Sequence, residues 1–177
     1  MIPVTLNLKN FMSYKSLELD FSEIHVACLS GENGAGKSSI LDAITWCLWE
    51  RARTPLNDDL IRLGESEMTV ELIFSLEEQL YRIIRGTKRS GKIKKSSQSS
   101  LEMQVMSDKG YKALTGKSIR ETQARIIETV KMDFNTFVNS AFILQGKADE
   151  FTTKSPIDRK KVLAEILNLN QYDVLQE

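Results

Sequence analysis

The chain has 177 residues, of which 41% are hydrophobic, and its 24 basic side chains balance 24 acidic ones. This length predicts about one globular domain, and the balanced charge gives by itself no reason to expect an anionic partner. No apolar stretch approaches the roughly 18 residues of a membrane-spanning helix, and no basic region followed by an apolar stretch marks an N-terminal leader. We therefore expect no membrane partner and a location in the cytoplasm or the nucleus.

The first thirty residues predict three strands. Apolar and polar residues alternate over 4–9 and again over 17–21, with a bend at Ser13 and Tyr14 between them. Such alternation indicates half-buried strands. The apolar stretch at 24–29 predicts a short buried strand that runs into the motif described below.

The cysteines and the histidine near this strand are interpreted as structural. Cys28 in the strand and Cys47 farther along are expected to be small buried residues of a protein in a reducing compartment, not a disulfide or metal pair. His25 is the only histidine, and we expect it to be half-buried and without catalytic chemistry.

Residues 31–38, Gly-Glu-Asn-Gly-Ala-Gly-Lys-Ser, match the phosphate-binding loop pattern G-x-x-x-x-G-K-[ST]. The glycines let successive backbone N–H groups point at a phosphate, while Lys37 supplies a mobile charge and Ser38 a hydroxyl for Mg²⁺. Apolar residues recur at helical spacing over 37–49, so a helix buried against a sheet is expected to follow the loop. Because the positive end of that helix would face the phosphate, the motif predicts a polyphosphate ligand.

After a polar connector at 51–66, the next elements predict an antiparallel meander. Alternation over 68–74, the apolar stretch at 80–85 and the alternation over 101–105 each indicate a strand. From Gln79 to Leu101 there is no acidic residue, so this part of the chain is locally very basic. Its basic residues are Arg82, Arg85, Lys88, Arg89, Lys92, Lys94 and Lys95.

Helices are expected in the last third of the chain. Ser118 and Glu121 form a capping-box pattern ahead of a helix whose apolar residues share one face. These residues are Ile119, Ile126, Ile127 and Val130. A further helix is expected over 133–145, and Ser155 with Pro156 in the first turn predicts the start of a last helix.

The chain lacks one expected part of a nucleotide-hydrolysing site. Such an enzyme needs an apolar strand that ends in an acid to hold Mg²⁺. Here the apolar residues 72–74 are followed by Ser75, and 83–84 are followed by Arg85. We therefore expect a catalytically incomplete site, whose remainder has been removed or lies on another chain.

These features resemble the SMC-like repair ATPases typified by bacterial SbcC and its archaeal and eukaryotic counterpart, the Rad-fifty protein. The likeness covers nearly the whole chain. Its sequence basis is Lys-Asn-Phe at 9–11, the stretch 31–39, the stretch 59–64 ahead of Val-Glu-Leu-Ile-Phe at 70–74, and Phe-Ile-Leu-Gln-Gly at 142–146.

The resemblance implies an α/β fold, the N-terminal half of an ABC-type P-loop ATPase head. It implies a mixed sheet with an antiparallel meander and helices, ending at the root of a coiled coil. Residues 1–154 would form the N-terminal lobe from the phosphate loop to the Q-loop. Residues 155–177 would form a helix leading to the coiled-coil root.

The same resemblance implies ATP and Mg²⁺ as cofactors and assigns roles to residues. Lys37 and Gln145 would be catalytic, and Ser38 and Gln145 would contact Mg²⁺. The residues implied to bind nucleotide are Asn33, Gly34, Ala35, Gly36, Lys37, Ser38, Ser39, Ile61 and Arg62. Met12 is a departure, since members often carry Arg at this position.

The implied partners are the C-terminal half of the same head, a second copy of the head, an SbcD-like nuclease subunit and double-stranded DNA. The location would be cytoplasmic, with the bacterial nucleoid, or nuclear in a eukaryote. Clustered cations suffice for sequence-independent binding to duplex phosphates, and the alternative for them is a solvated hairpin tip. The candidate DNA contacts are Lys88, Arg89, Lys92, Lys94 and Lys95.

Three other functions remain open on the sequence alone. The head could belong to a chromosome-organising or RecF-like relative without a nuclease. It could belong to a small-molecule or nucleotide kinase, although the meander after the first helix argues against that class. It could also be a module that holds ATP without turnover, which hydrolysis measured before and after adding a C-terminal half would distinguish.

Overall fold

The computed structural model describes residues 1–89, 97–140, 155–157, 159 and 160. Residues 1–129 form one compact unit and residues 130–177 another. Within the described residues, no helix is both long and apolar enough to cross a membrane.

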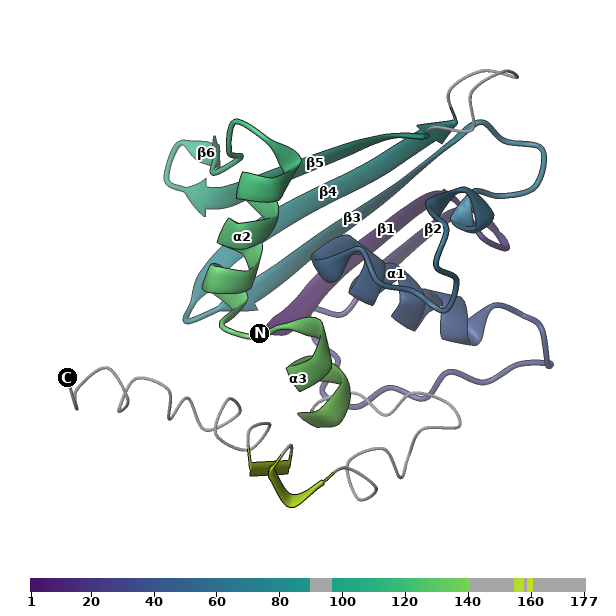
Figure 1. The fold of residues 1–177 in the computed structure, drawn as a ribbon, viewed down its shortest axis with the longest axis horizontal. Helices are drawn as coiled ribbons and strands as arrows, with labels where there is room; N and C mark the ends of the chain where they lie inside the picture. Colours follow the sequence, from purple (N-terminus) through teal and green to yellow (C-terminus); the bar gives the residue numbers. More distant parts are fainter. Residues whose placement is uncertain (90–96, 141–154, 158, 161–177) are drawn as a thin grey trace. The chain divides into compact units, whose positions relative to one another are not determined.

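The first unit is built on one antiparallel sheet of six strands in the order β2-β1-β3-β4-β5-β6 (Figure 1). The strands are β1 (Ile2–Phe11), β2 (Tyr14–Asp20), β3 (Glu67–Leu76), β4 (Gln79–Arg89), β5 (Ser97–Ser107) and β6 (Gly110–Ala113). The five strands expected from alternation at both ends of the connector are thereby confirmed. The short edge strand β6 was not predicted.

Cross-strand pairing explains why the register is well defined. Leu6 of β1 lies opposite Leu72 of β3, which lies opposite Ile83 of β4, which lies opposite Met103 of β5. All four side chains are fully buried. A slip of one residue in any pair would turn this apolar row to the solvent, so burial of one sheet face selects the register.

Two helices cover this apolar face, α1 (Lys37–Trp49) and α2 (Ile119–Val130), as Figure 1 shows. The expected burial of α1 against the sheet is confirmed, because the helix contacts β1, β3 and β4 and buries Trp46 and Leu48. Between α1 and β3, the connector contains a short 3₁₀ helix, η1 (Asn57–Leu60).

The capping box of α2 is confirmed, but the face that it buries differs from the expectation. The backbone N–H of Glu121 donates to the Ser118 hydroxyl at 3.2 Å. Ile126 is buried, whereas Ile119 and Ile127 are each 38% exposed, and Thr122 is buried in their place. Thr122 fits inside because its hydroxyl accepts from the N–H of Gly116 and donates to the carbonyl of Ser118, each at 3.0 Å.

In the second unit, the start of each expected helix is confirmed. Helix α3 (Phe134–Ser140) begins after Asp133, whose carboxylate accepts a hydrogen bond from the N–H of Thr136 at 2.7 Å. Farther on, the described residues 156, 157, 159 and 160 are helical, and the N–H of Arg159 donates to the carbonyl of Ser155 at 3.0 Å. The later parts of both expected helices lie outside the described residues.

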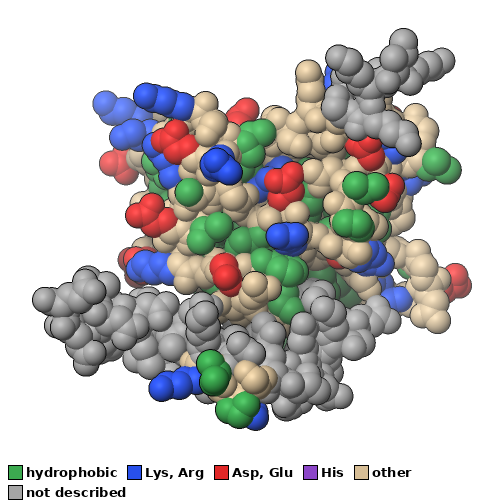
Figure 2. Space-filling model, in the orientation of Figure 1, with side chains coloured by type: hydrophobic (Ala, Val, Ile, Leu, Met, Phe, Trp, Pro, Cys, Tyr) green, Lys and Arg blue, Asp and Glu red, His purple; other side chains and the backbone are tan. Residues whose placement is uncertain are grey.

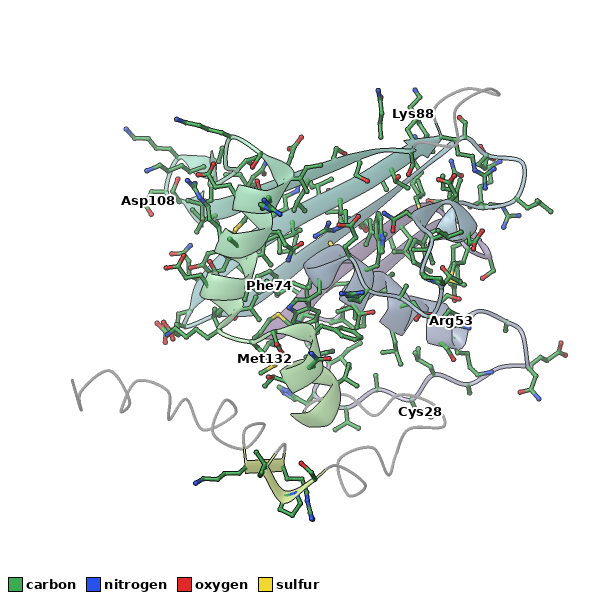
Figure 3. All side chains as sticks on the ribbon, in the orientation of Figure 1. Cys28, Arg53, Phe74, Lys88, Asp108 and Met132 are labelled. Carbon is green, nitrogen blue, oxygen red and sulfur yellow. The ribbon has the colours of Figure 1, made fainter. Side chains whose placement is uncertain are left out.

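The expectation of a buried strand at 24–29 is wrong. These residues belong to no strand, and Ile24, Val26 and Leu29 are 47%, 93% and 45% exposed. Cys28 and His25 are exposed as well, so their expected burial is also wrong (Figure 3). The physical reason is that a strand needs a neighbouring strand for its backbone groups, and no described strand pairs with this segment.

The other cysteine is buried as expected and predicts a loss of stability in alkali. Burial raises the pKa of the Cys47 thiol to about 12, whereas an unfolded thiol titrates at about 8.5. Below the unfolded pKa both states keep the proton, and between these two values only the folded state does. The free energy of unfolding therefore falls as pH rises through this range, by up to about 1.4 kcal/mol per pH unit.

Urea unfolding at pH 8 and pH 10.5 measures this effect. We expect the wild type to lose more stability over that interval than Cys47→Ala, which has no thiol to titrate. Cys28→Ser is the matched control, because the Cys28 thiol is exposed, and it should behave as the wild type does. Equal losses for the wild type and Cys47→Ala would contradict the prediction.

Candidate nucleotide site

The phosphate-loop sequence at 31–38 forms a tight loop that ends in α1. Gly34 and Gly36 have φ values of +86° and +90°, a conformation that costs side-chain-bearing residues roughly 1–2 kcal/mol. The N–H of Ala35 donates to the carbonyl of Glu32 at 3.2 Å, which closes the loop on itself. The glycines are thus required by the backbone that the structure has at these positions.

The Lys37 side chain folds back over this loop. Its ammonium Nζ donates to the carbonyls of Gly31 and Glu32, both at 2.8 Å. An ammonium has three donors, so one N–H of Lys37 remains for an anion at the mouth of the loop. The loop itself therefore holds the positive charge in place.

The N-terminal end of α1 is arranged to accept negative charge. No side chain caps this end, and its first turn contains no acidic residue. The first N–H groups of a helix have no partner within the helix, and together with the helix dipole they favour an anion. Ser38 is half-buried in this turn, and Ser39 is buried. Asn33, Gly34 and Ala35 are exposed on the loop.

The turn between β1 and β2 packs against the end of the phosphate loop. A Cβ atom added to Gly36 would lie 2.5 Å from the Ser13 hydroxyl oxygen and 3.1 Å from the Tyr14 ring. The guanidinium of Arg62 donates to the carbonyl of Ser13. The structure therefore brings Arg62 to the same turn that supports the loop.

Ile61 lies beside Arg62 but is less available. It forms an antiparallel bridge with Phe11, and the N–H of Arg62 donates to the carbonyl of Asn10 at 2.9 Å. The Ile61 side chain is only 4% exposed, so its principal contact is with the core. Of this pair, Arg62 presents the larger surface to a ligand.

The described cations of the locally basic segment have acidic or carbonyl partners from other elements. Lys88 lies 3.3 Å from Glu67, as Figure 3 shows for its place at the end of β4, and Arg82 lies 2.6 Å from Glu71. Arg89 donates to the backbone carbonyls of the connector instead. On the face drawn in Figure 2, basic and acidic side chains are interspersed. The charge imbalance of the sequence is thus largely compensated in space.

Four of the candidate residues lie outside the described residues. They are Gln145, Lys92, Lys94 and Lys95. Within the part of the chain that is described, no group of three or more His, Cys, Asp or Glu side chains is placed to hold a metal ion.

Sequence reasoning missed a buried arginine behind the site. Arg85 is 1% exposed and contacts the C-terminal end of α1, where its guanidinium donates to the carbonyl of Cys47 at 3.0 Å. The strand alternation held the signal, because positions 83 and 85 share one sheet face and Ile83 is a core residue. A charged residue in that position demands buried partners.

Comparisons with known proteins agree along the whole chain. The model of the AAA domain family matches residues 5–176. A DNA double-strand break repair Rad50 ATPase of Thermoplasma volcanium is 34% identical over 173 residues, which are 98% of this chain and 18% of that protein. The SbcC subunit of the nuclease SbcCD of Deinococcus radiodurans is 30% identical over 181 residues, which are 99% of this chain and 19% of that protein. The chain therefore spans about a fifth of the length of these relatives.

Solved structures share the fold. A chain from a study of ATP-driven dimerization and DNA-stimulated activation of SMC ATPases matches with a TM-score of 0.63 and 22% identity, over 94% of this chain and 99% of that one. The recombination mediator protein RecF with ATP matches with a TM-score of 0.50 and 20% identity, over 98% of this chain and 42% of that one. These likenesses confirm the expected α/β architecture of an ATPase head.

Proposed function

Because this chain belongs to the AAA domain family and is an N-terminal ATPase segment of the SbcC and Rad50 kind, we propose that it is the ATP-binding half of a DNA-repair ATPase head. The observation that carries the proposal is the Lys37 ammonium held over the glycine loop, at a helix end without cap or carboxylate. A polyphosphate is the ligand that this arrangement of charge and N–H groups suits best.

The residues at the loop fit ATP with Mg²⁺. The loop N–H groups and Lys37 would hold the phosphates, and Ser38 would hold the metal together with Gln145. Bound Mg²⁺ neutralises charge that develops on the phosphates during hydrolysis. Lys37 would stabilise the same charge, and Gln145 would orient the attacking water. Arg62 would contact the ribose or base from the β1–β2 turn.

A C-terminal half would complete the site. The apolar residues of 24–29 are exposed where a buried strand was expected, so this segment is ready to pair with strands supplied from elsewhere. The relatives are about five times longer than the matched region, which leaves ample chain for such strands. We call the combination of this chain with that C-terminal half the complete head.

Two complete heads would close on ATP and release on hydrolysis. Loss of the γ-phosphate releases other phosphate-held switches in the same way. In this proposal the cutting of DNA ends or hairpins belongs to a nuclease subunit of the SbcD kind, and the location is that of the DNA. Support comes from the relative that is part of a nuclease and from the fold shared with an SMC ATPase of which dimerization is described.

The second candidate is an SMC-like or RecF-like head that works without a nuclease. The observation in its favour is the fold that this chain shares with RecF over 98% of its length. Both candidates need the same ATP site. They differ only in whether a nuclease subunit binds the complete head, which co-purification with an SbcD-like protein would show.

ATP hydrolysis by separated and combined halves tests the proposal. We expect the chain alone to hydrolyse ATP no faster than the buffer background, because it lacks an acid for Mg²⁺ after its apolar strands. The complete head should turn over ATP, and duplex DNA should raise the rate. Glutamate at 92, 94 and 95 together should weaken DNA binding and flatten its salt dependence by up to about three phosphate contacts.

The control is the same triple change made where DNA is not expected, at Lys109, Lys112 and Lys117 outside the basic segment. A complete head without ATPase activity would sink the proposed function. Duplex DNA that binds and stimulates both triple variants equally well would remove only the assignment of DNA to the basic segment.

A further inference from the structure

A cluster of polar side chains closes around the C-terminal end of α1. Its members are Trp46, Glu50, Asn57, Arg85 and Gln123, which we call the α1 C-terminal cluster. With 13 residues, α1 is about 20 Å long. The cluster therefore lies at the opposite end of this helix from the phosphate loop.

Arg85 is the centre of the cluster. Its guanidinium donates to the carbonyl of Cys47 at 3.0 Å, to the Glu50 carboxylate at 3.3 Å and to the side-chain oxygen of Gln123. Gln123 of α2 in turn donates to the carbonyl of Leu48 at 2.8 Å. Carbonyls at a helix C-terminus have no partner within the helix and carry the negative end of its dipole. Arg85 therefore joins β4, α1 and α2 at one point.

Glu50 extends the cluster to the connector. The Asn57 side-chain amide donates to the Glu50 carboxylate at 2.8 Å, and its oxygen accepts from the indole N–H of Trp46 at 2.8 Å. Asn57 is the first residue of η1. The start of the 57–62 segment is thus fastened to the C-terminal end of α1.

The other end of the same segment is fastened near the phosphate loop. The N–H of Met12 donates to the carbonyl of Leu60 at 2.7 Å, and Arg62 donates to the carbonyl of Ser13. Ser13 is the residue that would clash with a side chain at Gly36. The 57–62 segment is therefore tied at one end to the C-terminus of α1 and at the other to the turn that supports the loop.

We propose that Arg85 is a positioning residue of the nucleotide site. Through Glu50 and Asn57 it fixes α1 to the 57–62 segment, so that the phosphate loop and Arg62 bind a nucleoside triphosphate as one rigid surface. The inference rests on the proposed function, because that function supplies the nucleotide and the contact of Arg62 with its ribose or base.

The chemistry of the guanidinium suits this role better than that of other cations. It is planar with five N–H donors, so it can serve acceptors on three elements at once, whereas an ammonium is a point charge. Burial lowers the pKa of Arg85, with Cys47 and Glu50 acting in the opposite direction, and the group stays charged because arginine does not deprotonate in proteins. A simple helix cap would need neither the burial nor the link to Asn57.

The test compares two ligands of the complete head, Mg-ATP and inorganic tripolyphosphate with Mg²⁺, by calorimetry. Tripolyphosphate needs only the phosphate loop, whereas ATP needs the loop and the 57–62 segment in register. We expect Arg85→Met and Asn57→Leu each to lower the affinity for ATP about tenfold. Each should change the affinity for tripolyphosphate by less than about twofold.

Arg82→Met is the matched control. Arg82 lies on the same strand and binds a carboxylate, Glu71, at 2.6 Å, but alternation places it on the opposite face of the sheet from α1. It should leave both affinities unchanged. If Arg85→Met does not fold, Asn57→Leu decides the outcome, because Asn57 is not in the core of the sheet.

Equal losses for both ligands would overturn the inference, since a general loosening of the fold weakens every ligand alike. Unchanged affinity for ATP would overturn it as well. So would a wild-type head that binds ATP but not tripolyphosphate, because the loop would then not be a separable part of the site. A wild-type head that binds neither ligand would instead contradict the proposed function.

Discussion

Replacing Lys37 by Met is expected to lower the affinity of the complete head for ATP by about a hundredfold. Hydrogen bonds to charged groups contribute about 1.5–3 kcal/mol each, and a loss near 3 kcal/mol corresponds to about a hundredfold in affinity. Methionine keeps most of the length of the side chain and removes the ammonium. Since the described contacts of the Lys37 ammonium are with two carbonyls of the loop, the fold itself should be little affected.

Calorimetric titration with Mg-ATP measures this loss, and thermal unfolding of the same samples checks the fold. Lys112→Met is the matched control, because Lys112 is exposed on the edge strand β6, and it should bind ATP as the wild type does. An affinity for ATP that is the same in Lys37→Met as in the wild type would contradict the assignment of the phosphates to this loop.

A methyl group at Gly36 is expected to abolish measurable ATP binding. Gly36→Ala has to keep a φ of +90° with a side chain and places a Cβ atom 2.5 Å from the Ser13 hydroxyl oxygen. The backbone strain costs roughly 1–2 kcal/mol, and either the loop or the β1–β2 turn has to move. Movement of the loop takes Lys37 and the helix N-terminus away from the phosphates.

Gly34→Ala separates these two effects. Gly34 also has a positive φ, +86°, but an added Cβ would meet no atom within 4 Å. It should therefore show the strain alone, as a smaller loss of affinity. Ser13→Ala removes the clashing hydroxyl and should restore part of the binding in the Gly36→Ala background. Identical losses in the two glycine variants, with no recovery, would show that the β1–β2 turn does not support the loop.

Elements whose partners lie close in the sequence could be predicted from it. The strands at both ends of the connector alternate with period two and pair with neighbours in hairpins, so local pattern and final pairing agree. The turn of β3 into β4 is one example, where Glu77 and Glu78 take φ values of +52° and +65°, which match the twist of a two-residue hairpin. The phosphate loop was equally readable, because its glycines meet a local backbone requirement.

Features that depend on distant partners could not be predicted. The apolar pattern of 24–29 indicates a buried strand, yet burial and strand pairing need neighbours that the described sheet does not supply. Arg85 looked like one of several surface cations, and only the packing of α1 and α2 shows that it is buried. The connector at 51–66 looked polar and open, but Arg89 clamps it through the carbonyls of Asp58 and Glu65.

The inner face of α2 shows a third limit. Counting apolar residues placed Ile119 and Ile127 inside, whereas the structure buries Thr122. A threonine that satisfies its hydroxyl within the helix and with a nearby N–H costs little to bury. Periodicity arguments that treat every polar residue as exposed cannot find such positions.

Calorimetry of the complete head with ATP and Mg²⁺ tests the central claim most directly. The account predicts saturable binding of one ATP per head that disappears, or weakens about a hundredfold, in Lys37→Met. Heat that stays at the level of dilution for a folded wild-type head, or binding that Lys37→Met leaves intact, would contradict it.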